Sequence, residues 1–253
     1  MSDDPGTSLL ADPATATSAT EMPLVSVLVP AYNEAATIEQ TLRRVVDLPV
    51  RLELIVVDDG SQDGTPEVLE RLADGELDGL RVIRHDANRG KGAAVRTAIA
   101  ASTGAIVVVQ DADLEYDPAD LPRVLGPIID GHADAVFGTR LRGGQPQRAH
   151  LFWHYAGNRF LSLLTNVLYN TTISDMEVGY KAFRGDLIRS LDLVSDDFRF
   201  EPEVTAKVLR HEGVRLYEVP ISYFGRTYAE GKKITWRDGI GAIGALLRFR
   251  FRD

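Results

Sequence analysis

Short runs of consecutive apolar residues alternate with segments of helical spacing along most of the chain. Runs rich in β-branched residues are typical of strands buried on both faces of a parallel sheet. They occur at residues 24–29, 52–57, 81–84, 105–109, 135–138 and 216–221. Segments with helical spacing lie at residues 38–46, 66–73, 92–101, 121–130, 151–168 and 201–212. The pattern predicts an α/β fold, with one mostly parallel sheet flanked by helices in a single domain.

Polar and small residues follow three of the predicted strands. In sheets of this kind, ligands bind outside the carboxyl ends of the strands, which meet at one edge. The segments at those ends are residues 30–34, 58–61 and 110–113. We therefore expect the functional site at this edge of the sheet.

A pair of aspartates follows the very apolar run 106–109. The carboxylates of Asp111 and Asp113 repel each other unless a cation or a proton lies between them. Hard oxygen ligands suit Mg²⁺ or Mn²⁺, which also takes oxygens from substrate phosphates and neutralises charge on a diphosphate leaving group. Glu115 is a candidate for a further ligand. A solvated turn is the alternative, because aspartate is common where strands end.

Two other segments suggest contacts with a nucleotide. Asp58 and Asp59 could accept hydrogen bonds from a nucleobase or a ribose, although an aspartate there can also cap the turn before the helix at Pro66. Residues 88–92, Asn-Arg-Gly-Lys-Gly, open a predicted helix, and their backbone N–H groups together with Lys91 favour an anion. This second motif is weak on its own, because glycine often merely starts a helix.

Six segments together resemble the family 2 glycosyltransferases with a GT-A (Rossmann-like) fold, and most closely the polyprenyl-phosphate (dolichyl-phosphate) mannose or glucose synthases. The matching segments are VLVPAYNE at 27–34, IVVDDGS at 55–61, NRGKGA at 88–93, VQDADLE at 109–115, DMEVGYKAFR at 175–184 and GRTYAEGKKI at 225–234. The resemblance runs from about residue 24 to residue 239, nearly all of the chain that is expected to be ordered.

The resemblance implies roles for the matching residues. The nucleoside would be held by Pro30, Tyr32, Glu34 and Asp58 or Asp59. With Lys91 and Asp111, these residues form the expected donor site. The metal would bind Asp111 and Asp113, with Glu115 as a further ligand where many relatives have glutamine. Arg140 and Arg226 would bind phosphate groups of acceptor or donor.

The same roles for arginine follow from the chemistry of a lipid phosphate. Such an acceptor is already an anion at neutral pH, so it needs no strong base, and the planar guanidinium matches phosphate oxygens. Arg226 lies with Lys232 and Lys233 in a glycine-flanked segment that predicts a mobile basic loop, or else a solvated surface loop. Asp175 could orient the acceptor, act as a base toward a sugar hydroxyl, or bond to a neighbouring backbone N–H.

Composition and charge narrow the function further. The chain has 253 residues, a net charge of −9 and no cysteine, which excludes disulfides and thiolate chemistry. Residues 1–139 carry 24 acidic and 10 basic side chains, whereas residues 140–253 carry 18 basic and 13 acidic ones. This asymmetry is either chance or a sign that the second half meets a phosphate or a lipid surface. Nucleic acid is not an expected partner of so acidic a chain.

Both ends of the sequence differ from its middle. Residues 1–22 are rich in Ser, Thr, Ala, Asp and Pro and predict a disordered tail, and no uncharged apolar run approaches the ~20 residues that span a bilayer. Residues 226–253 combine the basic loop with an amphipathic helix. That helix could lie in a bilayer interface, pack on the core or contact another subunit. We expect a cytoplasmic protein, peripheral on the inner face of the plasma membrane if this helix contacts lipid.

The sequence thus predicts a glycosyltransferase domain over residues 23–225. It would move a hexose from GDP-mannose or UDP-glucose to a polyprenyl phosphate, with inversion and with Mg²⁺ or Mn²⁺. Rival hypotheses are a transferase that acts on a soluble sugar or glycan hydroxyl, a sugar-nucleotide nucleotidyltransferase and a non-catalytic nucleotide-sugar binding protein. No glycine-rich, Arg/Lys-bearing motif follows the first predicted strand, which disfavours the nucleotidyltransferase.

Overall fold

A seven-stranded sheet forms the centre of the protein in a computed structural model that describes residues 22–146, 148, 151–225 and 236–252. The strands are β1 (Val25–Ala31), β2 (Leu52–Asp58), β3 (Leu80–Arg84), β4 (Ile106–Val109), β5 (Ala135–Thr139), β6 (Lys181–Arg184) and β7 (Leu216–Pro220). Their order is β3-β2-β1-β4-β6-β5-β7, and all neighbours pair in parallel except that β6 runs antiparallel to β4 and β5. The predicted α/β class with a mostly parallel sheet is confirmed.

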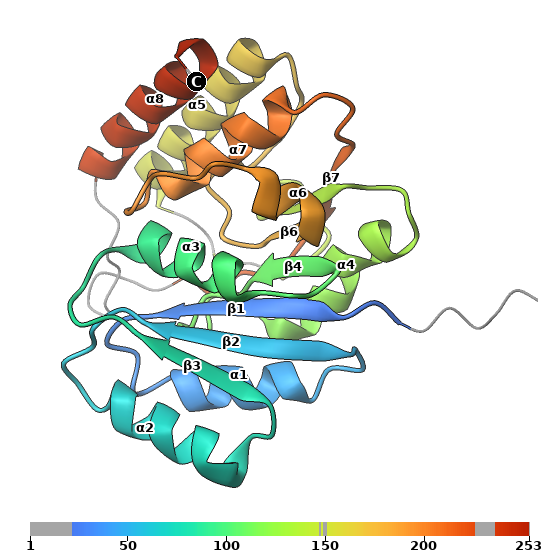
Figure 1. Ribbon diagram of the computed structural model, residues 1–253. Helices are drawn as coiled ribbons and strands as arrows, with labels where there is room; N and C mark the ends of the chain where they lie inside the picture. The colour runs from blue at the N-terminus through green and yellow to red at the C-terminus, as the bar shows by residue number, and fades with distance from the viewer. Residues whose placement is uncertain (1–21, 147, 149–150, 226–235, 253) are drawn as a thin grey trace, which may run out of the picture.

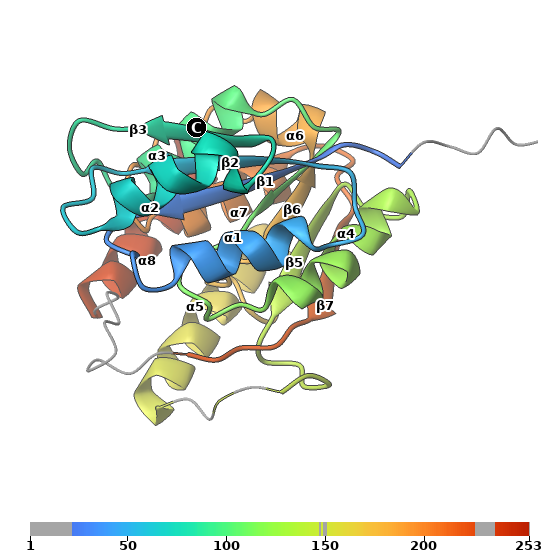
Figure 2. The ribbon, with the colours of Figure 1, turned by 90° about the horizontal axis from the view of Figure 1, so that it is seen from below.

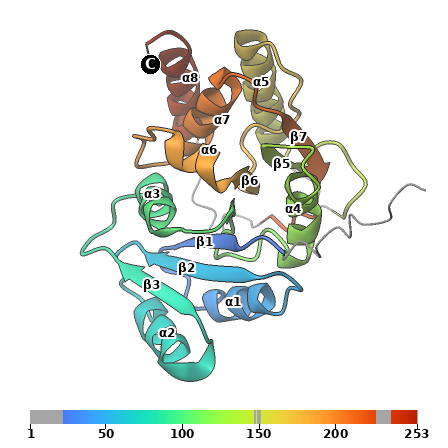
Figure 3. The same cartoon turned by 45° about the vertical axis from the view of Figure 1, so that its right-hand side comes forward.

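Helices cover both faces of this sheet (Figures 1 and 2). They are α1 (Ile38–Val46), α2 (Thr65–Arg71), α3 (Lys91–Ala101), α4 (Leu121–Ile129), α5 (Phe152–Tyr169), α6 (Gly185–Ser190), α7 (Phe200–Arg210) and α8 (Trp236–Phe251). A π-helical turn at Leu72–Glu76 and a 3₁₀ turn at Pro118–Asp120 complete the set in the described ranges. In Figure 3, α1 and α2 lie below the sheet, and α3, α6 and α7 lie above it.

The main core fills the space between the sheet and its helices. Strands β1, β2 and β4 are almost wholly buried, which explains their continuous apolar sequences. The helix α1 buries Ile38, Leu42 and Val45, which share one face because they recur at helical spacing. These residues and the strand residues join one large buried cluster, which fixes the edge of the sheet where the predicted site lies.

A second, smaller core joins three helices beyond the sheet. Helix α8 contacts both α5 and α7, and its Leu246 is fully buried with Leu161 of α5 and Met176. Phe249 of α8 is buried against Ala206 of α7. Figure 1 shows α5, α7 and α8 stacked together above the sheet. The C-terminal helix is therefore packed on the protein over much of its length, one of the alternatives that its sequence left open.

The structure adds two elements to the predicted pattern. Strand β6 and helix α6 follow each other at 181–190, a stretch for which no element was predicted. The four residues of β6 include the buried charge of Lys181, so they show neither an apolar run nor a clear alternation. Within the described ranges, none of the helices combines the length and hydropathy that crossing a membrane requires. Of the expected N-terminal tail, only Met22 lies within the described residues.

Candidate active site

A large pocket opens at the carboxyl edge of the sheet, where the sequence predicted a site. Its volume is about 770 Å³, and it is lined by the ends of β1 and β4 together with residues of α5, α7 and α8. The predicted site residues in this lining are Pro30, Tyr32, Glu34, Asp59, Lys91, Asp111, Asp113, Glu115 and Arg140. Two others, Asp58 and Asp175, are fully buried outside it, and Arg226 lies outside the described residues.

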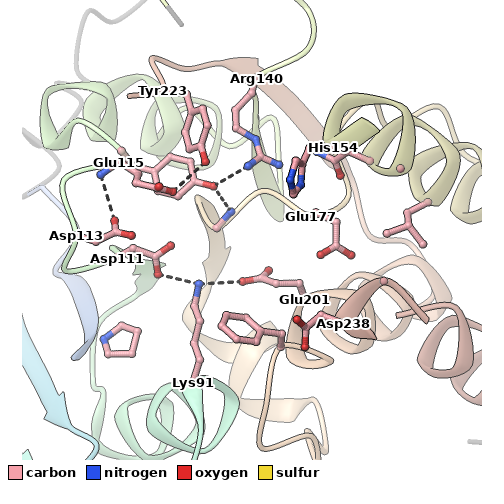
Figure 4. Close-up of a pocket in the computed structure, with 18 of the residues that line it drawn as sticks. Lys91, Asp111, Asp113, Glu115, Arg140, His154, Glu177, Glu201, Tyr223 and Asp238 are labelled. Atoms are coloured by element: carbon pink, nitrogen blue, oxygen red, sulfur yellow. Dashed lines mark hydrogen bonds and ion pairs between the residues drawn. The ribbon is translucent and has the colours of Figure 1, made fainter. Parts of the chain in front are cut away.

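Lys91 lies between two carboxylates on one wall of the pocket (Figure 4). Its Nζ is 2.8 Å from Asp111 Oδ1 and 3.5 Å from Glu201 Oε1. Burial alone would lower the pKa of Lys91, but the attraction of Asp111 and Glu201 outweighs it and holds the pKa above its ordinary value. The ammonium is therefore charged at neutral pH and stands beside the aspartate pair, where an anionic ligand would meet it.

The loop after β4 directs the second aspartate into the same pocket. Leu114 has a positive φ of 60°, and this turn lets Asp113 Oδ1 accept the N–H of Glu115 at 3.1 Å. The carboxylate of Glu115 accepts a hydrogen bond from the Tyr223 hydroxyl at 2.9 Å. Asp111 and Asp113 thus line the pocket as a pair, while Glu115 is engaged by a tyrosine.

The residues at the end of β2 organise the loop that carries Lys91. Asp59 accepts the N–H groups of Arg89 and Gly90 and a hydrogen bond from His85 Nδ1 at 2.6 Å. Asp58 Oδ1 accepts the N–H of Ser61. Asp59 therefore fixes the glycine-rich loop against the strand end. Of Asp58 and Asp59, only Asp59 lines the pocket.

Arg140 is held by a buried carboxylate behind the opposite wall. Its Nε and Nη2 each lie 2.7 Å from an oxygen of Asp175, and its backbone N–H donates to the same side chain. Asn158 Nδ2 also donates to Asp175, at 3.1 Å. Burial would raise the pKa of Asp175, but the charge and hydrogen bonds of Arg140 hold it below its usual value. Asp175 is 0% exposed and both of its oxygens accept hydrogen bonds from Arg140, so it holds this guanidinium in place, while its role as a base toward a sugar hydroxyl stays a prediction.

Two tyrosines complete the surroundings of Arg140. The Tyr116 hydroxyl lies 3.4 Å from Arg140 Nη1, and the Tyr223 ring lies 4.9 Å from the guanidinium carbon. The two rings pack together at 5.4 Å. This arrangement keeps the guanidinium in one orientation at the pocket.

Several pocket residues had no predicted role. They are Tyr116, His154, Glu177, Glu201, Tyr223 and Asp238. Glu177 belongs to the motif at 175–184, so its position beside Asp175 was a usable signal. Glu201 and Tyr223 come from a helix and a loop that only the fold brings to this edge. His85 likewise carries no signal in the sequence, because its partner Asp59 is 26 residues away.

Comparison with known proteins decides the family. A family model described as glycosyl transferase family 2 matches residues 26–191. This chain belongs to glycosyltransferase family 2. Its sequence is 34% identical over 242 residues to glycosyltransferase AglD of Haloferax volcanii, covering 88% of this chain and 36% of that protein. It is 31% identical over 220 residues to an undecaprenyl-phosphate mannosyltransferase of Micrococcus luteus, covering 82% and 86%.

Solved structures share the fold of this family 2 member. Glucosyl-3-phosphoglycerate synthase from Mycobacterium tuberculosis, in complex with Mn²⁺, UDP and phosphoglyceric acid, superimposes with a TM-score of 0.70. The alignment covers 90% of this chain and 79% of that one, at 24% identity. At this identity the likeness establishes the GT-A fold alone. The chain spans about a third of the length of the Haloferax relative, so the likeness there concerns one part of a longer protein.

The aspartate pair of this family 2 chain fits a divalent metal. In the described ranges, no group of three or more His, Asp or Glu side chains is arranged as a complete ligand set. Mg²⁺ is usually held by only one or two carboxylates, with waters and substrate phosphates as its other ligands. Two carboxylates in one pocket beside a charged lysine match that chemistry, because the phosphates of a donor would supply the remaining oxygens.

Gly179 offers a test of the placement of Asp111. A Cβ at this position would lie 2.6 Å from Asp111 Oδ2 and 3.0 Å from the Tyr116 ring, so Gly179→Ala must displace the aspartate. Misplacing a site group by about 1 Å can cost about a hundredfold in rate. We therefore expect Gly179→Ala to lower kcat/KM for sugar transfer by about that factor. Gly126→Ala on α4, where a Cβ meets nothing within 4 Å, is the control in the same steady-state assay. Equal activity of Gly179→Ala and Gly126→Ala would contradict the assignment of Asp111 to the active site.

Proposed function

We propose that the protein transfers a hexose from a nucleotide-diphosphate sugar to a polyprenyl phosphate, with inversion at the sugar carbon. The observation that carries this proposal is the guanidinium of Arg140, fixed by buried Asp175, in the same pocket as Asp111 and Asp113 (Figure 4). The pocket thus combines a carboxylate pair suited to a metal-bound diphosphate with a permanent cation suited to a second phosphate.

The donor would lie along the strand ends. Pro30, Tyr32 and Glu34 follow β1 in the pocket lining and would contact the nucleoside, with Asp59 beside them. Asp111 and Asp113 would hold Mg²⁺ or Mn²⁺, which when bound neutralises charge on the departing diphosphate. Lys91 adds a positive charge at the same place, because its pKa stays above the ordinary value.

The acceptor would lie at Arg140. Its guanidinium is charged at every relevant pH and can form paired hydrogen bonds with phosphate oxygens. An acceptor phosphate oxygen then attacks the anomeric carbon, the bond from that carbon to the diphosphate oxygen breaks, and the nucleoside diphosphate leaves with the electron pair. One such displacement inverts the anomeric centre. Because the acceptor is an anion, no side chain has to remove a proton, which agrees with the buried state of Asp175.

The relatives support this acceptor class without fixing the sugar. The Micrococcus protein is named an undecaprenyl-phosphate mannosyltransferase. A Pseudomonas aeruginosa relative, 28% identical over 83% of this chain, is named an undecaprenyl-phosphate 4-deoxy-4-formamido-L-arabinose transferase. We propose GDP-mannose or UDP-glucose as the donor, and a donor panel has to decide between them.

An apolar surface on α5 continues from the pocket and suits a lipid acceptor. Trp153, Tyr155 and Phe160 line the pocket and are also 81%, 42% and 55% exposed. Further exposed apolar side chains on or beside this helix are Leu151, Phe152, Leu163 and Val167. We propose that this face, more than α8 with its buried Leu246 and Phe249, contacts the membrane surface. The basic loop proposed at 226–235 lies outside the described residues.

Vesicle binding tests the membrane contact. Replacing both Phe152 and Trp153 with serine is expected to weaken binding to vesicles of anionic phospholipid by about tenfold, because two exposed aromatic side chains lose their burial in the interface. Ile129→Ser at the end of α4, an exposed apolar residue on another element, is the control. Cosedimentation measures both. Unchanged binding of the double variant would contradict a role for α5.

A donor panel tests the proposed activity. The purified protein is incubated with Mn²⁺, one polyprenyl phosphate and radiolabelled GDP-mannose or UDP-glucose, and product is measured by organic extraction. We expect label in the organic phase with one donor, and none when the metal is chelated. Transfer that needs no lipid acceptor would favour the rival that acts on a soluble hydroxyl. Donor binding without any turnover would favour a non-catalytic binding protein.

A further inference from the structure

Two glutamates that line the pocket each hold a buried oxygen without a hydrogen-bond partner. Among the described residues, Glu177 Oε1 and Glu201 Oε1 are two of five such side-chain atoms, and both belong to the pocket. Figure 4 shows their carboxylates on the same side of the cavity, across from the pair of aspartates. Glu201 Oε1 lies 3.5 Å from Lys91 Nζ, which is a long distance for an ion pair.

A buried lysine holds both glutamates in place. The side chain of Lys181 is 1% exposed, and its Nζ donates to the carbonyl oxygens of Met176 and Val178, at 3.0 and 2.5 Å, and to Glu201 Oε2. Because the two carbonyls flank Glu177, these bonds fix the turn from which that residue projects. The orientation of Glu177 and Glu201 is thus built into the fold.

A hydrogen-bond donor that enters the pocket would supply the missing partner of each ionised carboxylate. An ionised carboxylate only accepts hydrogen bonds, and leaving a buried oxygen unsatisfied costs free energy. A phosphate would be repelled by the two glutamates, whereas sugar hydroxyls can donate to both. Burial also raises the pKa of Glu177 to about 7, as expected of a carboxylate that its surroundings solvate poorly.

The position of the pair relative to the donor selects one part of the substrate. Lys91 contacts Asp111 on one side and Glu201 on the other, so a single ammonium separates Glu201 from the expected diphosphate site. The transferred sugar is bonded directly to that diphosphate. We infer that Glu177 and Glu201 form the subsite that binds hydroxyl groups of the transferred sugar, an inference that rests on the proposed function. Recognition of the sugar, in contrast to that of the nucleoside, would then lie on α7 and on the turn before β6.

Binding measurements separate recognition of the sugar from recognition of the nucleotide. The full chain, its variant Glu177→Gln and the control Glu212→Gln, an exposed glutamate just after α7, are titrated calorimetrically with Mn²⁺ present. The ligands are GDP-mannose and UDP-glucose, each beside its nucleotide, GDP or UDP. Glu177→Gln should bind the preferred nucleotide sugar about tenfold more weakly, the effect of losing one charge-assisted hydrogen bond. Its affinity for the nucleotide alone should stay within about twofold.

The outcomes distinguish this inference from the proposed function. Equal losses for nucleotide and nucleotide sugar, or no loss for either, would overturn the sugar subsite while the wild type still binds its donor. A wild type that binds none of the four ligands would overturn the proposed function and the subsite with it. Glu177→Asp, which keeps the charge but shortens the side chain, serves as the second variant and should show the same selective loss if Glu177→Gln does not fold.

Discussion

Replacing Asp113 with asparagine is expected to slow sugar transfer by about a thousandfold or more, because the proposed metal loses one of its two carboxylate ligands. The variant keeps the shape of the side chain, and its amide oxygen can still accept the N–H of Glu115, which Asp113 Oδ1 accepts at 3.1 Å. The loop after β4 should therefore stay in place, and the loss should fall on kcat with saturating donor and Mn²⁺.

The control for this prediction removes a carboxylate elsewhere. Asp130→Asn changes an exposed aspartate at the end of α4 and should leave transfer unchanged. Steady-state rates with radiolabelled donor measure both variants. Near-normal turnover by Asp113→Asn with metal present would refute the assignment of this residue as a ligand.

Asp175→Asn is expected to reduce transfer by about a hundredfold, chiefly through weaker use of the acceptor, because Arg140 loses the carboxylate that orients it. Breaking a buried ion pair by changing one partner also costs about 3–5 kcal/mol of stability. The distances of 2.7 Å from both Arg140 nitrogens and the complete burial of Asp175 are the basis for both effects. The acceptor KM should rise while the donor dissociation constant changes little.

A double-mutant cycle separates positioning from base catalysis. If Asp175 acts through Arg140, the double variant Arg140→Gln/Asp175→Asn should be no slower than Arg140→Gln alone. A base would give multiplied losses, and Asp175→Asn would remove the acidic limb of the pH–rate profile. A multiplied loss together with that change of profile would contradict the positioning role. Chemical denaturation of the same four proteins checks that each is folded.

Much of the sheet could be predicted from the sequence because its strands are local patterns. The runs at 24–29, 52–57 and 105–109 are almost uniformly apolar, and each became a strand buried on both faces. The rule that ligands bind at the carboxyl ends of such strands then located the pocket and the pair Asp111 and Asp113. These inferences needed only short windows of sequence.

The rest of the site depends on contacts between distant segments. Arg140 and Asp175 are 35 residues apart, and Tyr223 reaches Glu115 across 108 residues. No local pattern encodes such pairings, so the motif at 175–184 left three roles open for its aspartate. Strand β6 was missed for a related reason: its Lys181 is buried only because Glu201 and two carbonyls satisfy it.

The exposed apolar side chains show the same limit of local reasoning. The C-terminal segment has an amphipathic sequence, but tertiary packing decides which of its side chains stay exposed. Leu246 and Phe249 are buried against α5 and α7, whereas Trp153 on α5 is 81% exposed. Sequence periodicity identifies an apolar face, and only the fold determines whether that face is covered.

The most direct test of the account is the location of manganese in crystals grown with the preferred nucleotide diphosphate. We expect an anomalous difference peak between the carboxylates of Asp111 and Asp113 and the phosphate oxygens of the nucleotide, and no such peak in Asp113→Asn. Nucleotide bound in the pocket without metal between these groups, or manganese bound elsewhere, would contradict the central claim.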